Sequence, residues 1–192
     1  MLFRSRRLDQ LEKRNKRLTV ALTMMAMVAI TIQLSACGDD PAGPSTNCDV
    51  SDVKALAGRD LSGCDLVRAD LSSVDLSGAD LEGANLYDAN LRNANLRRAD
   101  LRSANLKSAD LRFADLGYAI LEGAILESAD LRGANLEAAD LAGANLTNAN
   151  LRGAGLAGAG LAGANLKSAN MEGADLSSTN LEGADMTGAN LT

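Results

Sequence analysis

The feature of this sequence that most constrains its fold is a period of five residues. From residue 59 onward, Leu or Met stands at every fifth position, and residues 59–188 divide into 26 consecutive units of five. Leu is the centre of 24 units, Ala stands two places before the centre in 22, and Asp or Asn stands one place before it in 22. A repeat this strict has to be interpreted before any local helix or strand preference.

Neither regular secondary structure fits this period. On an α-helix, five residues advance by about 500°, so successive Leu residues would face all directions. On a flat strand, five is an odd number, so successive Leu residues would alternate between two faces. A chain that turns a corner in every unit closes a square coil after four units, with each Leu and Ala inside. The Asp or Asn between them then points outward, and the frequent Gly at the end of a unit suits the corner.

Individual units resemble the consensus of a known family. The sequences Ala-Asp-Leu-Glu-Gly at 79–83 and Ala-Asn-Leu-Arg-Asn at 89–93 are similar to the repeats of pentapeptide-repeat proteins. The resemblance covers residues 59–192 and implies an all-β fold, a right-handed quadrilateral β-helix. The 26 units would make about 6.5 coils, stacked at roughly the 4.8 Å spacing of neighbouring strands.

The first 36 residues are typical of an export signal. Residues 1–17 carry seven Lys or Arg, and residues 18–34 form a run without charges, which together predict a secretory signal. The Leu-Ser-Ala-Cys sequence that ends at Cys37 resembles the lipobox of bacterial lipoproteins. That resemblance implies cleavage before Cys37 and a lipid on its sulfur. An uncleaved signal anchor remains the alternative, because a 17-residue apolar run is at the lower limit for spanning a bilayer.

These segments predict where the mature protein is located. Residues 37–47 are polar and rich in Gly and Pro, which indicates a flexible tether between the lipid and the rod. We expect an exported protein, anchored to a bacterial membrane on its periplasmic side. Gly38 follows Cys37 where Asp often marks inner-membrane retention, and this favours the outer membrane.

The two ends of the rod differ. Residues 48–58 are interpreted as an N-terminal cap, in which Ser51 begins a short helix that ends near Gly58. Terminal units of a solenoid need such caps because an end coil exposes apolar side chains. No cap is recognisable at Leu191 and Thr192, so that end would be frayed or covered by a partner, for example in a homodimer.

Two cysteines remain once Cys37 carries lipid. Cys64 occupies the inward Ala position of its unit, and Cys48 lies just before the predicted cap helix. Disulfides persist in exported proteins, so we predict a Cys48–Cys64 bond that joins the cap to the first coil. The alternative is that Cys64 is a small apolar filler and Cys48 a free thiol.

Composition excludes several functions. The sequence has no His, which removes the commonest general base and metal ligand, and outward Asp residues on a convex rod have no cleft in which to work as a catalytic pair. We therefore expect no enzyme, cofactor or metal site. Asp110 and Asp130 could hold Ca²⁺ loosely, but a solvated surface is favoured. Residues 37–192 carry a net charge of −11, so nucleic acid is not an expected partner.

One row of basic residues stands out when the units are stacked by 20. The residue after the central Leu is Arg at positions 92, 112, 132 and 152, and we name Arg92, Arg112, Arg132 and Arg152 the arginine ladder. Like charges one coil apart repel by about 1 kcal/mol per pair in water. The ladder therefore indicates an anionic partner, such as an envelope polymer, or neutralisation by Asp110 and Asp130. A merely solvated face is the third interpretation.

The outward Asp/Asn position is interrupted near the middle of the rod. Ile120 and Ile125 replace the polar residue there, and Phe113 and Tyr118 lie close to them in sequence. Exposed apolar groups tend to be contact sites, so these four residues are candidates for binding a protein. Alternatively, the aromatic rings shield the two Ile side chains.

The function that these features favour is an interaction or structural role. Known members of the similar family include quinolone-resistance proteins, which resemble DNA and protect DNA gyrase. A chain with an export signal does not meet that cytoplasmic enzyme. Our main hypothesis is therefore a lipid-anchored cell-envelope module, and the alternative is a DNA mimic that binds a type II topoisomerase without being exported.

Overall fold

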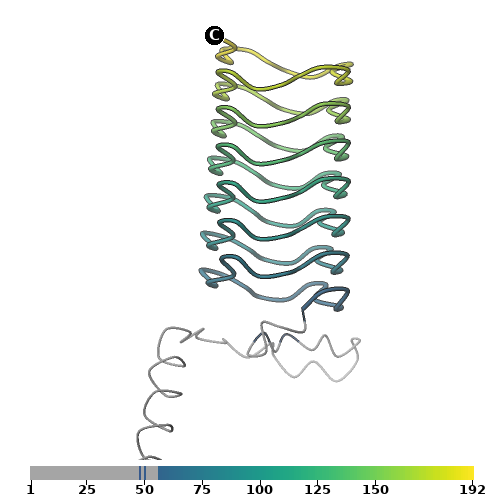
Figure 1. Cartoon of the computed structure of the whole chain (residues 1–192). Helices are drawn as coiled ribbons and strands as arrows, with labels where there is room; N and C mark the ends of the chain where they lie inside the picture. Colours follow the sequence, from purple (N-terminus) through teal and green to yellow (C-terminus); the bar gives the residue numbers. More distant parts are fainter. Residues whose placement is uncertain (1–47, 49, 51–55) are drawn as a thin grey trace, which may run out of the picture. The chain divides into compact units, whose positions relative to one another are not determined.

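Residues 48, 50 and 56–192 are described by the structure, a computed structural model, and most of them form a rod of stacked coils (Figure 1). The described chain has no helix and no extended strand. Each unit instead contributes a two-residue turn and a single parallel β-bridge to the unit 20 residues further on, from Asp60–Asp80 to Asn170–Asn190. One coil therefore contains four units, as the five-residue period predicts.

In a unit that has Asp or Asn before its centre and a coil on either side, all five backbone N–H groups have an acceptor. One closes the turn, one reaches the coil before, two reach the coil after, and one binds the side chain of the unit's own Asp or Asn. In the unit 79–83, the N–H groups donate in order to the Leu76 carbonyl (3.0 Å), the Arg59 carbonyl (2.8 Å), the Asp100 carbonyl (2.7 Å), the Asp80 carboxylate (3.0 Å) and the Arg102 carbonyl (2.8 Å). Because buried amides need partners, this network leads to a stack rather than a flat sheet.

The side-chain acceptor gives the Asp or Asn position a role that outward polarity alone does not predict. In unit after unit its Oδ1 atom accepts the N–H two residues later, as Asn105 does from Lys107 at 3.2 Å. Many of these side chains also bridge coils: Asn105 donates its amide to Asn85 Oδ1 at 3.0 Å. Asp and Asn are both common there because each supplies the accepting oxygen.

Every corner of the rod requires a left-handed backbone conformation. In each two-residue turn the second residue, which is the third of the four residues of a β-turn, has φ between 52° and 74°. Gly stands at 13 of these positions and another residue at 14. A positive φ at this place is the mark of a type II turn. Residues with a Cβ, such as Ala138 (φ 52°), adopt it at a cost of about 1–2 kcal/mol.

The core is apolar throughout the described residues. The central Leu residues from Leu56 to Leu166 are almost fully buried, as are the Ala residues two places before the centres from Ala69 to Ala169. No polar or charged residue is buried among them. Exposure rises in the last coil, where Leu191 is 52% exposed, because no further coil of the described chain lies over it.

The start of the rod is closed by the residues just before it. Val50 and Leu56 are fully buried, and Cys48 is 9% exposed. Cys48 forms a disulfide with Cys64 in the first coil, with the two Cα atoms 5.5 Å apart. The bond predicted from the sequence is thus present in the structure. The predicted cap helix lies largely in residues 51–55, outside the described residues.

The inward and outward positions should respond differently to truncation. We expect Leu116→Ala to lower the free energy of unfolding by about 2–5 kcal/mol through the cavity it leaves. Asn105→Ala should cost less, about 1–2 kcal/mol, the net value of its hydrogen bonds with Lys107 and Asn85. Denaturant unfolding followed by circular dichroism measures both, and equal losses would contradict the assignment of the two positions.

The corners provide a second stability test. Ala138→Gly should stabilise the rod by about 1 kcal/mol, because Gly adopts the left-handed conformation without strain. Ala142 is the matched control, since it occupies the preceding position of a turn and has no positive φ. Ala142→Gly should destabilise by about 0.5–1 kcal/mol. Thermal unfolding that shows the same sign for both variants would exclude left-handed strain as the cause.

Candidate interaction surface

Functional side chains gather at two neighbouring corners of the rod. The arginine corner comprises the turns at 72–73, 92–93, 112–113, 132–133, 152–153 and 172–173, and it carries the whole arginine ladder. The Tyr118 corner comprises the turns at 57–58, 77–78, 97–98, 117–118, 137–138, 157–158 and 177–178. One side of each coil, such as residues 113–118, connects the two.

Carboxylates neutralise most of the arginine ladder. Arg112 pairs with Asp110 and lies 3.6 Å from Asp130, and Arg132 pairs with Asp130 at 2.6 Å. Arg152 pairs with Glu172, one coil further on, at 3.1 Å. Of the interpretations open from the sequence, neutralisation by neighbours thus describes these three arginines.

The titration behaviour of these carboxylates reflects the pairs. The hydrogen bond from Arg112 is the main cause that lowers the pKa of Asp110. Burial raises the pKa of Asp130, but the hydrogen bonds and charge of Arg132 outweigh it, so this pKa is also below its ordinary value. Both carboxyls therefore stay ionised beside their arginines at neutral pH.

Arg92 differs from the rest of the ladder. It forms no ion pair with any residue in the described part of the chain, and its guanidinium lies 5.9 Å from the centre of the Phe113 ring. Phe113 lies one coil further on, where the absent Cβ of Gly133 leaves room for its ring. An anion-binding role of the ladder stays a prediction. Arg92 is the member most available for it, because its charge helps to lower the pKa of Asp110 but forms no ion pair with that carboxylate, which pairs with Arg112.

The four candidate apolar residues do not form a single patch. All are exposed, Phe113 by 57% and Tyr118 by 46%, and Ile120 and Ile125 by 38% and 39%. Phe113 belongs to the arginine corner and Tyr118 to the Tyr118 corner, whereas Ile120 and Ile125 lie on the next two sides of the same coil. They form a belt around one coil, and their role as contacts stays a prediction.

The Tyr118 corner contains two adjacent arginines that the sequence analysis did not select. The Arg97 guanidinium lies 5.3 Å from the centre of the Tyr118 ring and 3.4 Å from the Asp115 carboxylate. It occupies the space that a Cβ on Gly117 would need. Residues spaced by 20 form a row that the sequence makes recognisable, whereas a dipeptide of arginines confined to one coil has no repeat to mark it.

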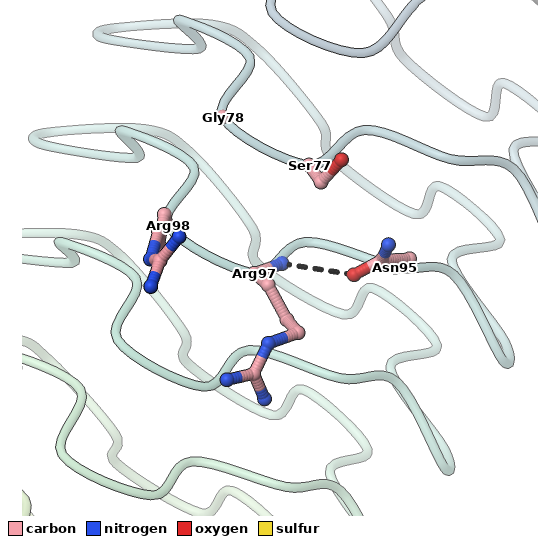
Figure 2. A pocket seen from close by; sticks show the side chains of 5 residues that line it. All are labelled: Ser77, Gly78, Asn95, Arg97 and Arg98. Carbon is pink, nitrogen blue, oxygen red and sulfur yellow. Dashed lines mark hydrogen bonds between the residues drawn. The ribbon is translucent and has the colours of Figure 1, made fainter.

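Beside these arginines the surface is hollowed. A shallow hollow of about 330 Å³ is lined by Ser77, Gly78, Asn95, Arg97 and Arg98. Figure 2 shows Arg97 and Arg98 extending from the same corner, with Ser77 one coil away and Asn95 accepting the Arg97 backbone N–H at 3.2 Å. Arg98 is exposed and has no ion pair with another described residue.

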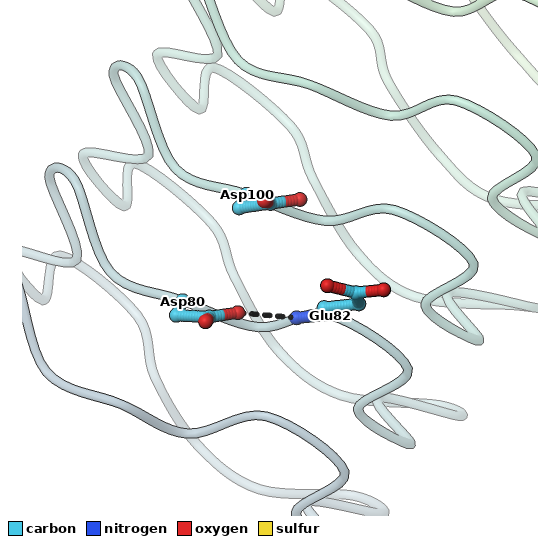
Figure 3. A group of neighbouring side chains, drawn as sticks. All are labelled: Asp80, Glu82 and Asp100. Carbon is cyan, nitrogen blue, oxygen red and sulfur yellow. Dashed lines mark hydrogen bonds between the residues drawn. The ribbon is translucent and has the colours of Figure 1, made fainter.

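One acidic group has the spacing of metal ligands. Asp80, Glu82 and Asp100 have carboxylate oxygens within 4.8 Å of one another (Figure 3). Arg102 already lies among them, 3.0 Å from Glu82 and 2.6 Å from Asp100. Its hydrogen bond is the main cause that lowers the pKa of Asp100. The group is thus an ion-pair cluster, in which a metal ion would have to displace a guanidinium.

The carboxylates of the rod predict how its stability depends on pH. The Thr187 hydroxyl and backbone N–H, together with Lys167, hold the pKa of Asp185 at about 2, and the pKa values of Asp60, Asp75, Asp100, Asp110, Asp130 and Asp175 are also lowered. Groups with lowered pKa values stabilise the fold above their unfolded pKa, near 3.8, and lose that contribution as the pH falls through the folded one.

We therefore expect the melting temperature to hold from about pH 7 to about pH 4 and to fall between about pH 4 and about pH 2. Asp185→Asn keeps an oxygen that accepts the Thr187 N–H, but this side chain does not titrate. The melting temperature of this variant should therefore fall less on acidification than that of the wild type. Thermal scans across this range provide the test. A melting temperature that stays constant down to about pH 2 would contradict the expectation.

Comparison with known proteins identifies the class of the fold. A family model for pentapeptide repeats matches eight copies, over residues 55–86, 84–123, 129–167 and 154–192. The chain belongs to the pentapeptide-repeat family, and its fold is the right-handed quadrilateral β-helix. A search of curated protein sequences found no match.

Several solved structures are similar. A pentapeptide repeat protein of the Arabidopsis thaliana thylakoid lumen is 33% identical, with a TM-score of 0.52, over 58% of this chain and 78% of that one. HetL of the cyanobacterium Nostoc, involved in heterocyst differentiation regulation, is 35% identical over 68% and 75%, with a TM-score of 0.29. The plasmid-mediated fluoroquinolone resistance protein QnrB1 is 22% identical over 73% and 86%, with a TM-score of 0.52, a likeness that shows the fold alone.

Among the residues that the structure describes, none belongs to a helix with the length and hydrophobicity needed to cross a membrane.

Proposed function

We propose that this protein is a cell-envelope lipoprotein that acts as an interaction module through the sides of its solenoid. Lipid on Cys37 would hold it to the membrane, and residues 37–47 would let the rod reach a partner. The observation that carries the proposed role is how polar and apolar side chains are distributed in the rod. Its described interior is entirely apolar, and its charged and polar side chains lie on the outer surface. Such a surface suits recognition rather than catalysis, since a catalytic pair needs a shielded site.

The disulfide supports the exported location. Cys48 and Cys64 are bonded. The bond joins the first coil, which contains Cys64, to Cys48, which lies only 11 residues after Cys37. Disulfides persist in oxidising compartments and are rare in the bacterial cytosol. A rod held by such a bond directly after a lipobox is consistent with function outside the cytoplasm.

The hypothesis of a DNA mimic gains no specific support. The likeness to QnrB1 concerns the fold, at 22% identity. The exposed corners also carry arginines, and Arg92 and Arg98 form no ion pair with other described residues. A surface that mimics DNA would present negative charge without such interruptions. A homodimer through the last coil remains a proposal, as does a protein partner for the belt of apolar residues.

The anchor is tested with the full chain expressed in a bacterium. Wild type should incorporate labelled palmitate and fractionate with membranes, and Cys37→Ala should lose the label and remain unprocessed or become soluble. A matched control is Cys48→Ala, which removes a thiol that we expect to be in a disulfide and should leave the label in place. A wild-type chain that is unlabelled and cytoplasmic would contradict the proposal and favour the topoisomerase hypothesis.

A further inference from the structure

Most described cations of the rod pair with a carboxylate, and two exceptions lie in the same coil. Eight of the described cations have a carboxylate within 4.0 Å, in most cases one coil away or two residues earlier. They are Arg68, Arg97, Arg102, Lys107, Arg112, Arg132, Arg152 and Lys167. Arg92 and Arg98 have no such partner in the described part of the chain, and both are exposed. They belong to the same coil and lie at the two ends of one of its sides.

Two aromatic rings lie at the same two corners, one coil further on. Phe113 is beside Arg92 and Tyr118 is beside Arg97, with the ring centres 5.9 Å and 5.3 Å from the guanidinium carbons. The side that connects them, residues 113–118, is at most about 20 Å long. Aromatic rings and unmatched cations therefore border a single side of the rod.

Packing does not explain why these rings are there. Phe113 and Tyr118 are exposed, and both adopt the left-handed conformation, with φ of 58° and 61°. Gly occupies the equivalent place in 13 of the 27 turns. The other 14 turns carry a non-Gly residue there, and only Phe113 and Tyr118 among these are aromatic. A bulky ring is not needed to form the turn and adds nothing to the core, so its strained placement points to function.

Acidic groups on this side already have partners. The Asp115 carboxylate accepts the Gly117 N–H and the Asn135 amide, at 3.0 Å each, and pairs with Arg97. Asp75 accepts the Asn95 amide at 2.9 Å, and hydrogen bonds from Ser77 and Asn95 lower its pKa. Their charges are thus partly satisfied within the rod. Arg98 has no carboxylate within 4.0 Å in the described chain, and Arg92 interacts with one only at longer range, since its charge contributes to the lowered pKa of Asp110.

We propose that this side binds a strand of acidic polysaccharide. The inference rests on the proposed function, because it names the envelope polymer that the module would hold. A sugar ring has an apolar C–H face that stacks on an aromatic ring. Its hydroxyls can use the hydrogen-bonding capacity that Ser77 and Asn95, in the hollow, keep beyond their bonds to Asp75 and Arg97. Arg92 and Arg98 supply the charge that matches carboxylates on the glycan, and the planar guanidinium suits bidentate contact with them.

The binding test uses the full chain, purified in detergent and immobilised, with polygalacturonate as the probe. Wild type should bind it in low salt and lose affinity as salt is added. The double variant Arg92→Gln/Arg98→Gln should bind about tenfold more weakly or less. The control Arg68→Gln/Lys107→Gln removes the same charge from cations outside the arginine ladder that are paired with Asp88 and Glu127, and should retain affinity within about twofold.

The aromatic variants separate recognition from structure. Phe113→Gly/Tyr118→Gly should weaken binding as strongly as the arginine variant, while its melting temperature stays at or above that of wild type because Gly relieves the left-handed strain. Unchanged affinity in this variant would overturn a stacking role for the rings. A lower melting temperature would show that the rings are structural.

Binding to other polymers and to vesicles identifies the chemical class of the ligand. Dextran, which is neutral, should not bind. Poly-L-glutamate that binds as well as polygalacturonate would overturn the glycan in favour of an acidic protein, and binding confined to phosphatidylglycerol vesicles would overturn it in favour of lipid headgroups. No binding to any acidic probe would also refute the site. Palmitate labelling is measured separately, so a failed anchor and a failed glycan site give different results.

Discussion

The structure depends on hydrogen bonds between backbones 20 residues apart. Three of the five N–H groups in a unit bind the coil before or after it, and the other two are used within the turn. This arrangement holds only if every unit turns by the same amount, which requires a left-handed residue at every corner. Leu and Ala then fill the interior as a consequence, because the inward positions leave room for one large and one small side chain per unit.

That regular frame places outer side chains in vertical register. A residue at a corner lies beside those 20 positions before and after it, which explains why ion pairs such as Arg68–Asp88 and Lys107–Glu127 join successive coils. Exposed pairs of this kind contribute little stability each. They do decide which charges remain available to a partner, so the electrostatic surface of the rod follows from its register.

The period of five predicts the coil, its inward Leu and Ala and its outward Asp or Asn, because these follow from geometry that holds for every unit. It does not predict that Asn105 accepts a backbone hydrogen bond, since outward polarity and a turn-stabilising acceptor have the same sequence pattern. The sequence predicts the arginine ladder as a row, and it leaves neutralisation by Asp110 and Asp130 as one of three interpretations because the pairing depends on rotamers. The pairing of Arg152 with Glu172 was not among them. Arg98 was missed because it has no equivalent in other coils.

The strained corners also indicate how such a rod acquires specificity. Its interior tolerates little variation, whereas a corner accepts any residue whose left-handed conformation the neighbouring hydrogen bonds can hold. Phe113 is held in this way by its own N–H, which donates to the Arg132 carbonyl at 3.1 Å, and its ring has space because residue 133 is Gly. The hydrogen-bonded frame therefore holds a side chain that itself contributes little to the stability of the fold. Because each coil adds only about 5 Å to the rod, a few such residues are enough to make one level of the surface chemically distinct from the next.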